Sequence, residues 1–225
     1  IGLDEEFAAH SQEWTETDLG QMILQLSGEK PMHMVMPAIH KDKKEVQQLF
    51  NDKLGSKVED DTEALVSYAS KVLRTKYMNS GIGITGANFI VADPGAVAFT
   101  ENEGNVLLAA SRTRIHIVIA GIDKVIPTIN DLHTFLPVLS TYGTGQKLTA
   151  YNTILTGPRK AGETDGPDEM YVVLIDNGRS KVLGEELQRK MLSCIRCGAC
   201  QYHDPVYSVI GAHPYHSTWM GPPAT

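Results

Sequence analysis

All three cysteines of the chain fall in one short stretch, Cys194-Ile195-Arg196-Cys197-Gly198-Ala199-Cys200. A loop with this C-x2-C-x2-C spacing can turn several thiolates toward one centre, which is how proteins hold an iron–sulfur cluster. Structural disulfides explain the pattern poorly, because the number of cysteines is odd and cytosolic thiols stay reduced. The spacing therefore predicts a metal or cluster site at Cys194, Cys197 and Cys200.

Two inorganic centres suit these thiols. In the bacterial ferredoxin run C-x2-C-x2-C-x3-C-P a fourth cysteine precedes a proline, and Asp204-Pro205 occupies that place here. This match favours a [4Fe–4S] cluster. His203 completes a C-x2-C-x2-C-x2-H set, so a tetrahedral zinc site is the alternative. His213 and His216 follow in the same segment and are further candidate ligands.

A second group of polar residues could bind a small anion, because ligands of wound α/β sheets lie beyond the carboxyl ends of the strands. The glycine-rich stretch 81–88 resembles a phosphate loop, but it precedes a predicted strand and not a helix, so it does not meet the dinucleotide-binding pattern. Ordinary turn chemistry is the simpler explanation for 93–95 and 101–105. The candidate substrate ligands are Thr85, Asn88, Asp93, Glu103, Asn105 and Gln146.

Composition excludes several classes of protein. With 225 residues, 42% hydrophobic and 21% charged, the chain has the makeup of an ordinary globular domain with room for a short appendage. A net charge of −7 argues against a general nucleic-acid binder. We expect no membrane span and a cytoplasmic location, since no apolar run is long enough and no signal-peptide pattern opens the chain.

Alternating amphipathic and apolar runs predict an α/β fold. Helices are expected over 46–54 with Asp42 and Glu45 as a capping box, over 65–77 introduced by Asp60 and Glu63, over 129–139 capped by Thr128, and over 183–191. Strands are expected over 89–92, 115–120 and 171–175, with shorter candidates at 96–100, 106–109 and 151–155. Two of the first three are nearly continuous in apolar residues, as in parallel strands covered on both faces. Residues 157–168 are expected to form a surface loop.

The expected organisation is one α/β domain over 1–192, followed by a loop-rich cysteine segment over 193–225. Ile1 is not an initiator methionine, and residues 1–5 read like the interior of a domain, so we expect the domain to be truncated at its N-terminus.

Several stretches together resemble a known family, in order and over nearly the whole chain. They are Gly83-Ile84-Thr85-Gly86-Ala87-Asn88-Phe89, Thr100-Glu101-Asn102-Glu103-Gly104-Asn105, residues 115–128, Thr144-Gly145-Gln146, Thr156-Gly157-Pro158-Arg159, Asp176-Asn177-Gly178-Arg179-Ser180 and the cysteine stretch. The resemblance is to the iron–sulfur subunits of bacterial lactate-utilisation systems (LutB type), which contain the lactate-utilisation (LUD) domain.

This resemblance implies a mainly parallel sheet flanked by helices, in the NagB/RpiA/CoA-transferase-like class. It also implies electron transfer in the oxidation of L-lactate to pyruvate, with companion lactate-utilisation subunits and a small anionic substrate such as lactate. Cys194, Cys197 and Cys200 match the first three cysteines of the first family motif and would ligate one [4Fe–4S] cluster. A cysteine of a second, downstream motif would supply the fourth ligand.

The chain departs from the family pattern in places. Asp204 stands where the family has the cysteine that ligates the other cluster, and Asp93 stands where many members have Glu. The second cysteine motif and the expected N-terminal half of the domain are absent from the sequence. Two other functions therefore stay open: a small-anion or acyl-binding LUD enzyme without a functional cluster, and an interaction module stabilised by zinc.

Overall fold

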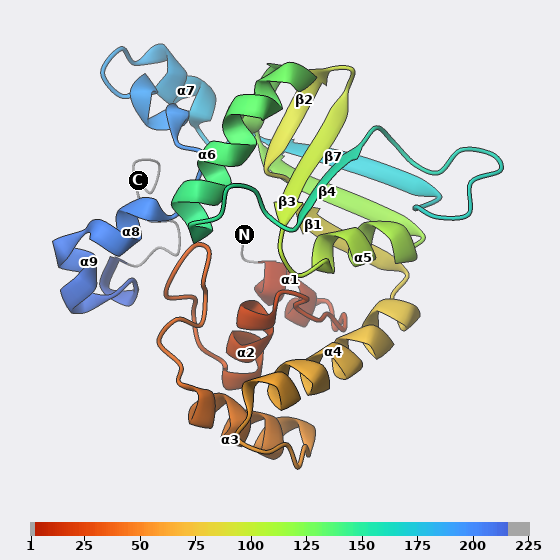
Figure 1. Ribbon diagram of the computed structural model, residues 1–225. Coiled ribbons are helices and arrows are strands. Elements are labelled where there is room, and N and C mark those ends of the chain that lie inside the picture. Colours follow the sequence, from red (N-terminus) through yellow and green to blue (C-terminus); the bar gives the residue numbers. More distant parts are fainter. Residues whose placement is uncertain (1–2, 216–225) are drawn as a thin grey trace.

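The computed structural model describes residues 3–215, in which two β-sheets are packed together and flanked by helices (Figure 1). The longer helices are α1 (Leu3–Ala9), α2 (Leu19–Ser27), α3 (Lys43–Leu54), α4 (Thr62–Asn79), α5 (Asn105–Arg112) and α6 (Leu132–Thr144). Short helices and 3-10 turns are η1 (Ile122–Lys124), η2 (Ile129–Asp131), α7 (Arg179–Gly184), η3 (Arg189–Ser193), α8 (Ala199–His203), α9 (Pro205–Ile210) and η4 (His213–Tyr215).

The first sheet is the parallel one that the sequence predicts. Its order is β1 (Ile82–Gly86), β4 (Ile115–Gly121) and β7 (Glu169–Ile175), with β4 in the centre. All three strands run in the same direction, so their carboxyl ends, at Gly86, Gly121 and Ile175, share one edge. That edge is where an α/β sheet usually places a ligand.

The second sheet is mixed, which the sequence analysis did not foresee. Its order is β5 (Val125–Thr128), β2 (Phe89–Asp93), β3 (Ala96–Glu101) and β6 (Tyr151–Leu155). β2 is parallel to β5, whereas β3 is antiparallel to both β2 and β6. The tight Pro94-Gly95 turn between β2 and β3 makes an antiparallel hairpin, because two residues leave no room for a crossover helix.

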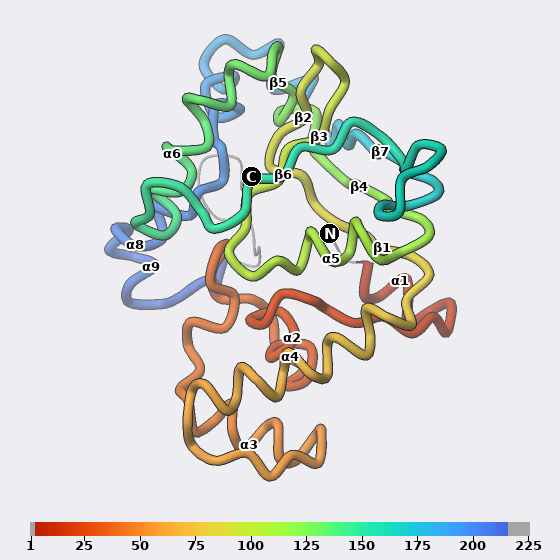
Figure 2. The backbone as a smooth tube through the Cα atoms, turned by 45° about the vertical axis from the view of Figure 1, so that its right-hand side comes forward, coloured from red at the N-terminus to blue at the C-terminus, as the bar shows by residue number. Residues whose placement is uncertain are grey.

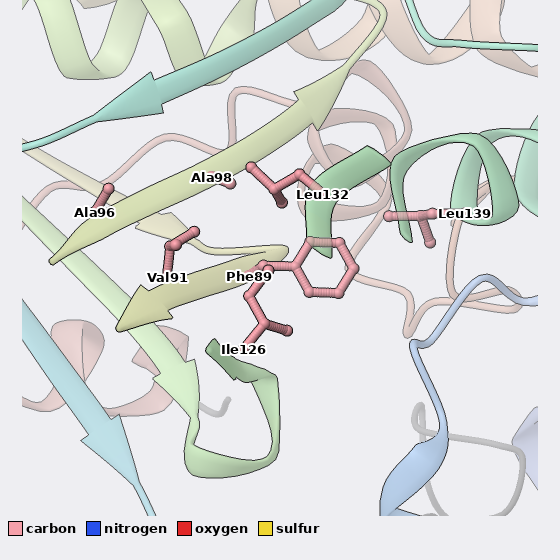
Figure 3. Packing of buried hydrophobic residues seen from close by; sticks show 7 residues of the cluster. All are labelled: Phe89, Val91, Ala96, Ala98, Ile126, Leu132 and Leu139. Carbon is pink, nitrogen blue, oxygen red and sulfur yellow. The ribbon is translucent and has the colours of Figure 1, made fainter. Parts of the chain in front are cut away.

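Buried side chains join the sheets to each other and to α6. Val97 and Phe99 of β3 pack against Val118 of β4, between the two sheets. On the other face of the second sheet, Phe89 packs against Leu132 and Leu139 of α6 (Figure 3). α6 therefore lies over β2 and β5, and its far end reaches the C-terminal segment (Figure 1).

The helix starts confirm most of the predicted caps. Asp42 accepts a hydrogen bond from the Glu45 amide, and the Glu45 side chain returns one to the Asp42 amide, so α3 begins with the expected capping box. Thr128 and Asp131 form a second box ahead of α6. α4 is capped by Asp61, one residue later than Asp60, because the Asp61 carboxylate accepts from the Ala64 amide.

Four predicted elements are wrong. Residues 106–109, expected as a strand, belong to α5, whose first amides donate to the Glu101 carboxylate. The glycine-rich stretch itself holds a strand, β1, and a Cβ at its Gly83 would lie 2.7 Å from the Ala109 carbonyl oxygen of α5. The helix expected over 183–191 is split into α7 and η3, and Leu187 between them is 91% exposed. The cysteine segment, expected as loop, contains α8 and α9.

β7 is also less covered than expected. The apolar run suggested burial on both faces, but Tyr171, Val172, Val173 and Leu174 are all exposed. Within residues 3–215, β7 lies at the edge of its sheet and pairs with β4 alone. Because successive side chains point to opposite faces, these four exposed residues show that neither face of β7 is fully covered. Ile82 and Ile84 of β1, at the opposite edge, are exposed as well.

Within residues 3–215 we find no helix with the length and apolar character needed to cross a lipid bilayer.

The contact between α6 and β2 should be a main source of stability. Leu132 is 3% exposed and belongs to the cluster around Phe89. Leu132→Ala should lower the free energy of unfolding by about 2–5 kcal/mol, the usual cost of a leucine-sized cavity. The matched Leu187→Ala change, at an exposed leucine, should stay within about 0.5 kcal/mol. Urea unfolding followed by circular dichroism measures both, and equal losses would contradict this packing.

Candidate functional site

The three cysteines lie on a short segment that runs alongside α6. Cys194 directly follows η3, and Cys200 lies in the first turn of α8. Between them Gly198 has a φ of 78°, a left-handed conformation that favours glycine and that starts α8. Cys194 and Cys197 are half-buried, Cys200 is exposed, and none of the three forms a disulfide.

The thiols are close enough to influence one another. Burial raises the pKa of the Cys200 thiol above its ordinary value, and negative charge on Cys194 and then on Cys197 raises it further. Packing several thiolates together has this effect, because each like charge disfavours the next. A bound metal or cluster removes the repulsion by neutralising the sulfurs. The three thiols thus form one electrostatic group.

A single zinc ion and a [4Fe–4S] cluster require different arrangements of the three thiols. Among residues 3–215, no three His, Cys, Asp or Glu side chains are grouped as one metal ion requires. A zinc ion needs all four ligands at bonding distance from a single point. In a [4Fe–4S] cluster each cysteine binds a different iron, so the sulfurs surround a larger object and need not converge. A [4Fe–4S] cluster at these three thiols therefore stays a prediction.

The cysteine loop is seated on the α/β core. Ile195 and Cys197 pack against the buried cluster around Phe89. At the end of α6, a Cβ on Gly143 would lie 3.3 Å from the Cys197 carbonyl oxygen, so this approach suits glycine. The Tyr202 hydroxyl donates to the Gly143 carbonyl over 3.2 Å. The loop therefore follows the end of α6 closely.

The other side of the segment packs on residues 30–36, which connect α2 to α3 (Figures 1 and 2). The Met34 amide donates to the side-chain oxygen of Gln201, and the Tyr207 hydroxyl donates to the Met32 carbonyl. The buried His33 ring stacks on Tyr202 with centroids 4.5 Å apart.

His33 is held as a neutral ring. Burial lowers its pKa below the ordinary value. Its Nδ1 accepts from the amides of Val35 and Met36, at 3.0 and 3.1 Å, so the proton of the neutral ring is on Nε2. Because Nδ1 already serves two amides, His33 acts as a structural link between residues 33–36 and the cysteine segment.

Asp204 has a structural role. Its Oδ1 accepts from the Val206 and Tyr207 amides, at 2.8 and 3.2 Å, which makes it the N-cap of α9 ahead of Pro205. Its carboxylate is therefore engaged by the backbone.

The three histidines considered as ligands differ in their placement. His203 ends α8 and is exposed, and Nε2 of His213 lies 3.0 Å from the Lys30 carbonyl oxygen. His216 lies outside the described residues. Assignment of His203 as a metal ligand stays a prediction.

Charged residues that the sequence analysis missed meet the cysteine loop at the carboxyl edge of the parallel sheet. Asp123 follows β4, and its carboxylate contacts Arg179 after β7 and Arg196 between Cys194 and Cys197. Lys124 lies next to Asp123 and donates to the Ala87 carbonyl after β1, over 2.7 Å. The available signal for Asp123, Lys124 and Arg179 was their position after a predicted parallel strand. For Arg196 it was the place between Cys194 and Cys197.

The six candidate substrate ligands belong to separate hydrogen-bond groups. Thr85 is buried between the sheets and bonds His116, whereas Asn88 accepts from the Thr100 amide on β3. The Glu103 carboxylate accepts from the Leu19 amide, and its partial burial with Asp18 nearby raises its pKa.

The remaining three do not join them. Gln146 exchanges hydrogen bonds with Asn102, Asp93 is exposed at the end of β2, and Asn105 opens α5. All six lie within residues 3–215, and there no hydrogen bond links any two of them. Their joint role in binding a small anion stays a prediction.

Comparison with known protein families identifies the family of this chain. The family profile of the LUD domain matches residues 4–175, which is most of the chain. The chain belongs to the LUD domain family.

Several curated relatives are similar to this LUD protein over nearly all of its length. It is 42% identical over 223 residues to lactate utilization protein B of Bacillus velezensis, covering 99% of this chain and 47% of that protein. The Bacillus subtilis protein of the same name is 41% identical, covering 99% and 46%. An uncharacterized electron transport protein of Escherichia coli, YkgF, is 42% identical over 207 residues, covering 92% and 43%. The chain thus spans about half the length of the curated relatives it matches.

Among solved structures, the chain shows a weak likeness to a DUF162 family protein from Deinococcus radiodurans. The TM-score is 0.33 at 16% identity, covering 44% of this chain and 56% of that one.

The cysteine segment follows the part of the chain that matches the LUD profile, yet it packs on LUD residues from two directions. α6 and residues 30–36 both lie within 4–175. The relatives' similarity, in contrast, continues over 223 residues and so includes the cysteines. The LUD domain and the cysteine segment therefore form one packed unit in residues 3–215.

Gly198 should be needed for this packing. A Cβ at Gly198 would lie 3.0 Å from His33 Cε1 and 3.1 Å from Val35 Cγ2, and the backbone is left-handed. At Gly145, which has a similar φ of 73°, a Cβ would meet nothing within 4 Å. Gly145→Ala should cost about 1–2 kcal/mol from the backbone alone. Gly198→Ala should cost more, as measured by urea unfolding. Equal costs for the two changes would show that residues 33–35 do not hold the cysteine segment.

His116 should make the LUD domain less stable in mild acid. Its ring is fully buried, and burial lowers its pKa below the ordinary 6.5. The unfolded chain then binds a proton at His116 more readily than the folded chain does. The stabilisation by neutral His116 is therefore complete above about pH 6.5, and it is lost as the pH falls below that value. The NMR shift of the His116 ring should titrate with a midpoint below 6.5. A midpoint at or above 6.5 would contradict this, and His116→Gln should weaken the acid dependence of unfolding.

Proposed function

We propose that Cys194, Cys197 and Cys200 provide three ligands of a [4Fe–4S] cluster, and that the chain serves in electron transfer during the oxidation of L-lactate to pyruvate. The main support is the C-x2-C-x2-C spacing of three free thiols on a loop that is seated on the LUD core. The similarity to lactate utilization protein B and to an electron transport protein supports the assignment.

The position of Asp204 is consistent with this function. By the family resemblance, the cysteine that Asp204 replaces ligates a second cluster, so its loss takes no ligand from the first. The Asp204 carboxylate instead caps α9 and orders the segment that follows the cysteines. The fourth ligand of the first cluster would be a cysteine of the second family motif, which this chain does not contain.

When bound, the cluster would carry electrons one at a time, at a potential set by nearby charge, hydrogen bonds and solvent exposure. The oxidation of one lactate to pyruvate releases two electrons and two protons, so it requires two successive one-electron transfers. The chain's own residues hold the sulfurs in place: Ile195 is anchored in the core, and Tyr202 is hydrogen-bonded to the end of α6. We further propose that the whole protein works with companion lactate-utilisation subunits, and that lactate is oxidised in that complex.

Reconstitution tests the cluster directly. The chain is incubated anaerobically with ferric iron, sulfide and an excess of a small thiol, which reduces part of the iron and completes the ligand set. It should take up about four iron and four sulfide ions per chain. The reduced product should give the EPR signal of a [4Fe–4S] centre.

Two variants sharpen this test. Cys197→Ser should lose most of the iron, because one corner of the cluster loses its thiolate, whereas the exposed Leu187→Ala should bind as much as the wild type. A folded, colourless wild type without iron would contradict the proposal. Zinc at one ion per chain, without iron, would support the zinc-stabilised module instead.

A further inference from the structure

One buried carboxylate connects the parallel sheet to the cysteine loop. The Asp123 side chain is only 2% exposed at the carboxyl end of β4. Its Oδ1 lies 2.5 Å from Arg179 Nε, and its Oδ2 lies 3.5 Å from a terminal nitrogen of Arg196. Arg179 begins α7 after β7, and Arg196 lies between Cys194 and Cys197. The carboxylate therefore contacts two elements that are distant in sequence.

The ion pair of Asp123 and Arg179 lies so close to Gly121 that no side chain fits at that position. A Cβ at Gly121 would lie 2.2 Å from Asp123 Oδ1 and 2.9 Å from Arg179 Nε, so any other residue there would displace the ion pair. Arg196 has a φ of 61°, which is uncommon for a residue with a side chain. A residue keeps such a backbone only when its surroundings hold it there. The ion pair with Asp123 is one such restraint on the loop.

Lys124 adds a third cation at the same place. Its ammonium group is bonded to the Ala87 carbonyl at the end of β1. Burial, together with the positive charge of Arg196, lowers the pKa of Lys124 to about 8, and negative charge on Asp123 and Cys194 opposes that shift. Arg179, Arg196 and Lys124 thus lie around Asp123, and Lys124 is near enough to Cys194 for their charges to interact.

Positive charge beside the cysteine loop would influence the reduction potential of a bound cluster. A [4Fe–4S] cluster with four thiolates carries a net charge of −2 when oxidised and −3 when reduced, as the sum of its iron, sulfide and thiolate charges shows. Nearby cations stabilise the more negative, reduced form and raise the reduction potential. Cations fixed on the sheet would act on the cluster only if the loop were fixed relative to the sheet.

We propose that Asp123 is a positioning residue for the cluster: it holds Arg196, and with it the Cys194–Cys197 loop, at the carboxyl edge of the parallel sheet, where Arg179, Arg196 and Lys124 face the cluster. This inference rests on the proposed function, since it assigns a role toward the cluster held by the three cysteines. It deepens that function by naming residues of the LUD domain that govern how firmly the cluster is held and at what potential it works.

A double-mutant cycle on the reconstituted full chain tests this role. Asp123→Asn and Arg196→Gln are made singly and together, and the rate of iron loss to a chelator is measured. Each single change should speed the loss several-fold. The double variant should lose iron no faster than Arg196→Gln alone, because Asp123 acts through Arg196. Fully additive effects would overturn the positioning role.

The reduction potential is the readout that a merely structural role would not move. In EPR-monitored redox titrations, Arg196→Gln should lower the potential enough to change the ratio of reduced to oxidised cluster about tenfold, or about 59 mV for one electron. Arg196→Lys should restore the potential toward that of the wild type, because it keeps the charge. Arg114→Gln, which removes an exposed arginine at the other end of β4, is the matched control and should leave the potential unchanged.

The outcomes separate the two proposals. If the wild type binds no iron and sulfide, the proposed function fails and this inference fails with it. If the wild type binds a cluster, but Asp123→Asn and Arg196→Gln retain it equally well and at the same potential, this inference alone is overturned. If Asp123→Asn does not fold, the potentials of the wild type, Arg196→Gln and Arg196→Lys decide, and three equal values overturn the role of this charge group.

Discussion

The ion pairs of Asp123 connect the carboxyl edge of the parallel sheet to the cysteine loop. A buried carboxylate is costly unless cations compensate it, and removing one partner leaves an uncompensated charge behind. Asp123 has two partners, one on α7 and one on the cysteine loop. If the cysteine loop moved away from the sheet, the buried Asp123 carboxylate would lose its contact with Arg196. The ion pair therefore favours the observed position of the loop.

Two further contacts make the cysteine segment part of the domain. Its inner side contacts the core through Ile195 and the end of α6 through Tyr202. Its outer side, in α8 and α9, is hydrogen-bonded to residues 30–36. Ligands of a metal centre need such support, because a site held by a mobile loop loses its geometry. Support from three directions would suit the proposed cluster, whose ligand sulfurs would have to stay in fixed positions.

Much of the fold could be predicted because its signals are local. The capping box of Asp42 and Glu45 and the box at Thr128 depend on residues three positions apart, and both are present. The errors arose where neighbours in space decide. Residues 106–109 look like a strand by composition, but Glu101 caps them as a helix. The apolar run of β7 suggested full burial, yet a run of this kind cannot show which faces the rest of the chain covers.

Two features could be found from the amino-acid sequence alone: three thiols at C-x2-C-x2-C spacing, and a resemblance to lactate-utilisation proteins that the family match supports. The sequence also pointed to the carboxyl ends of the strands as the place for a site. Which charged groups lie beside the cysteine loop depends instead on the packing of distant elements. Asp123 and Arg196 are 73 positions apart, and they meet because β4 ends beside the path of the cysteine loop along α6. Contacts between residues so far apart in the sequence depend on how sheets and helices pack, so local sequence patterns cannot predict them.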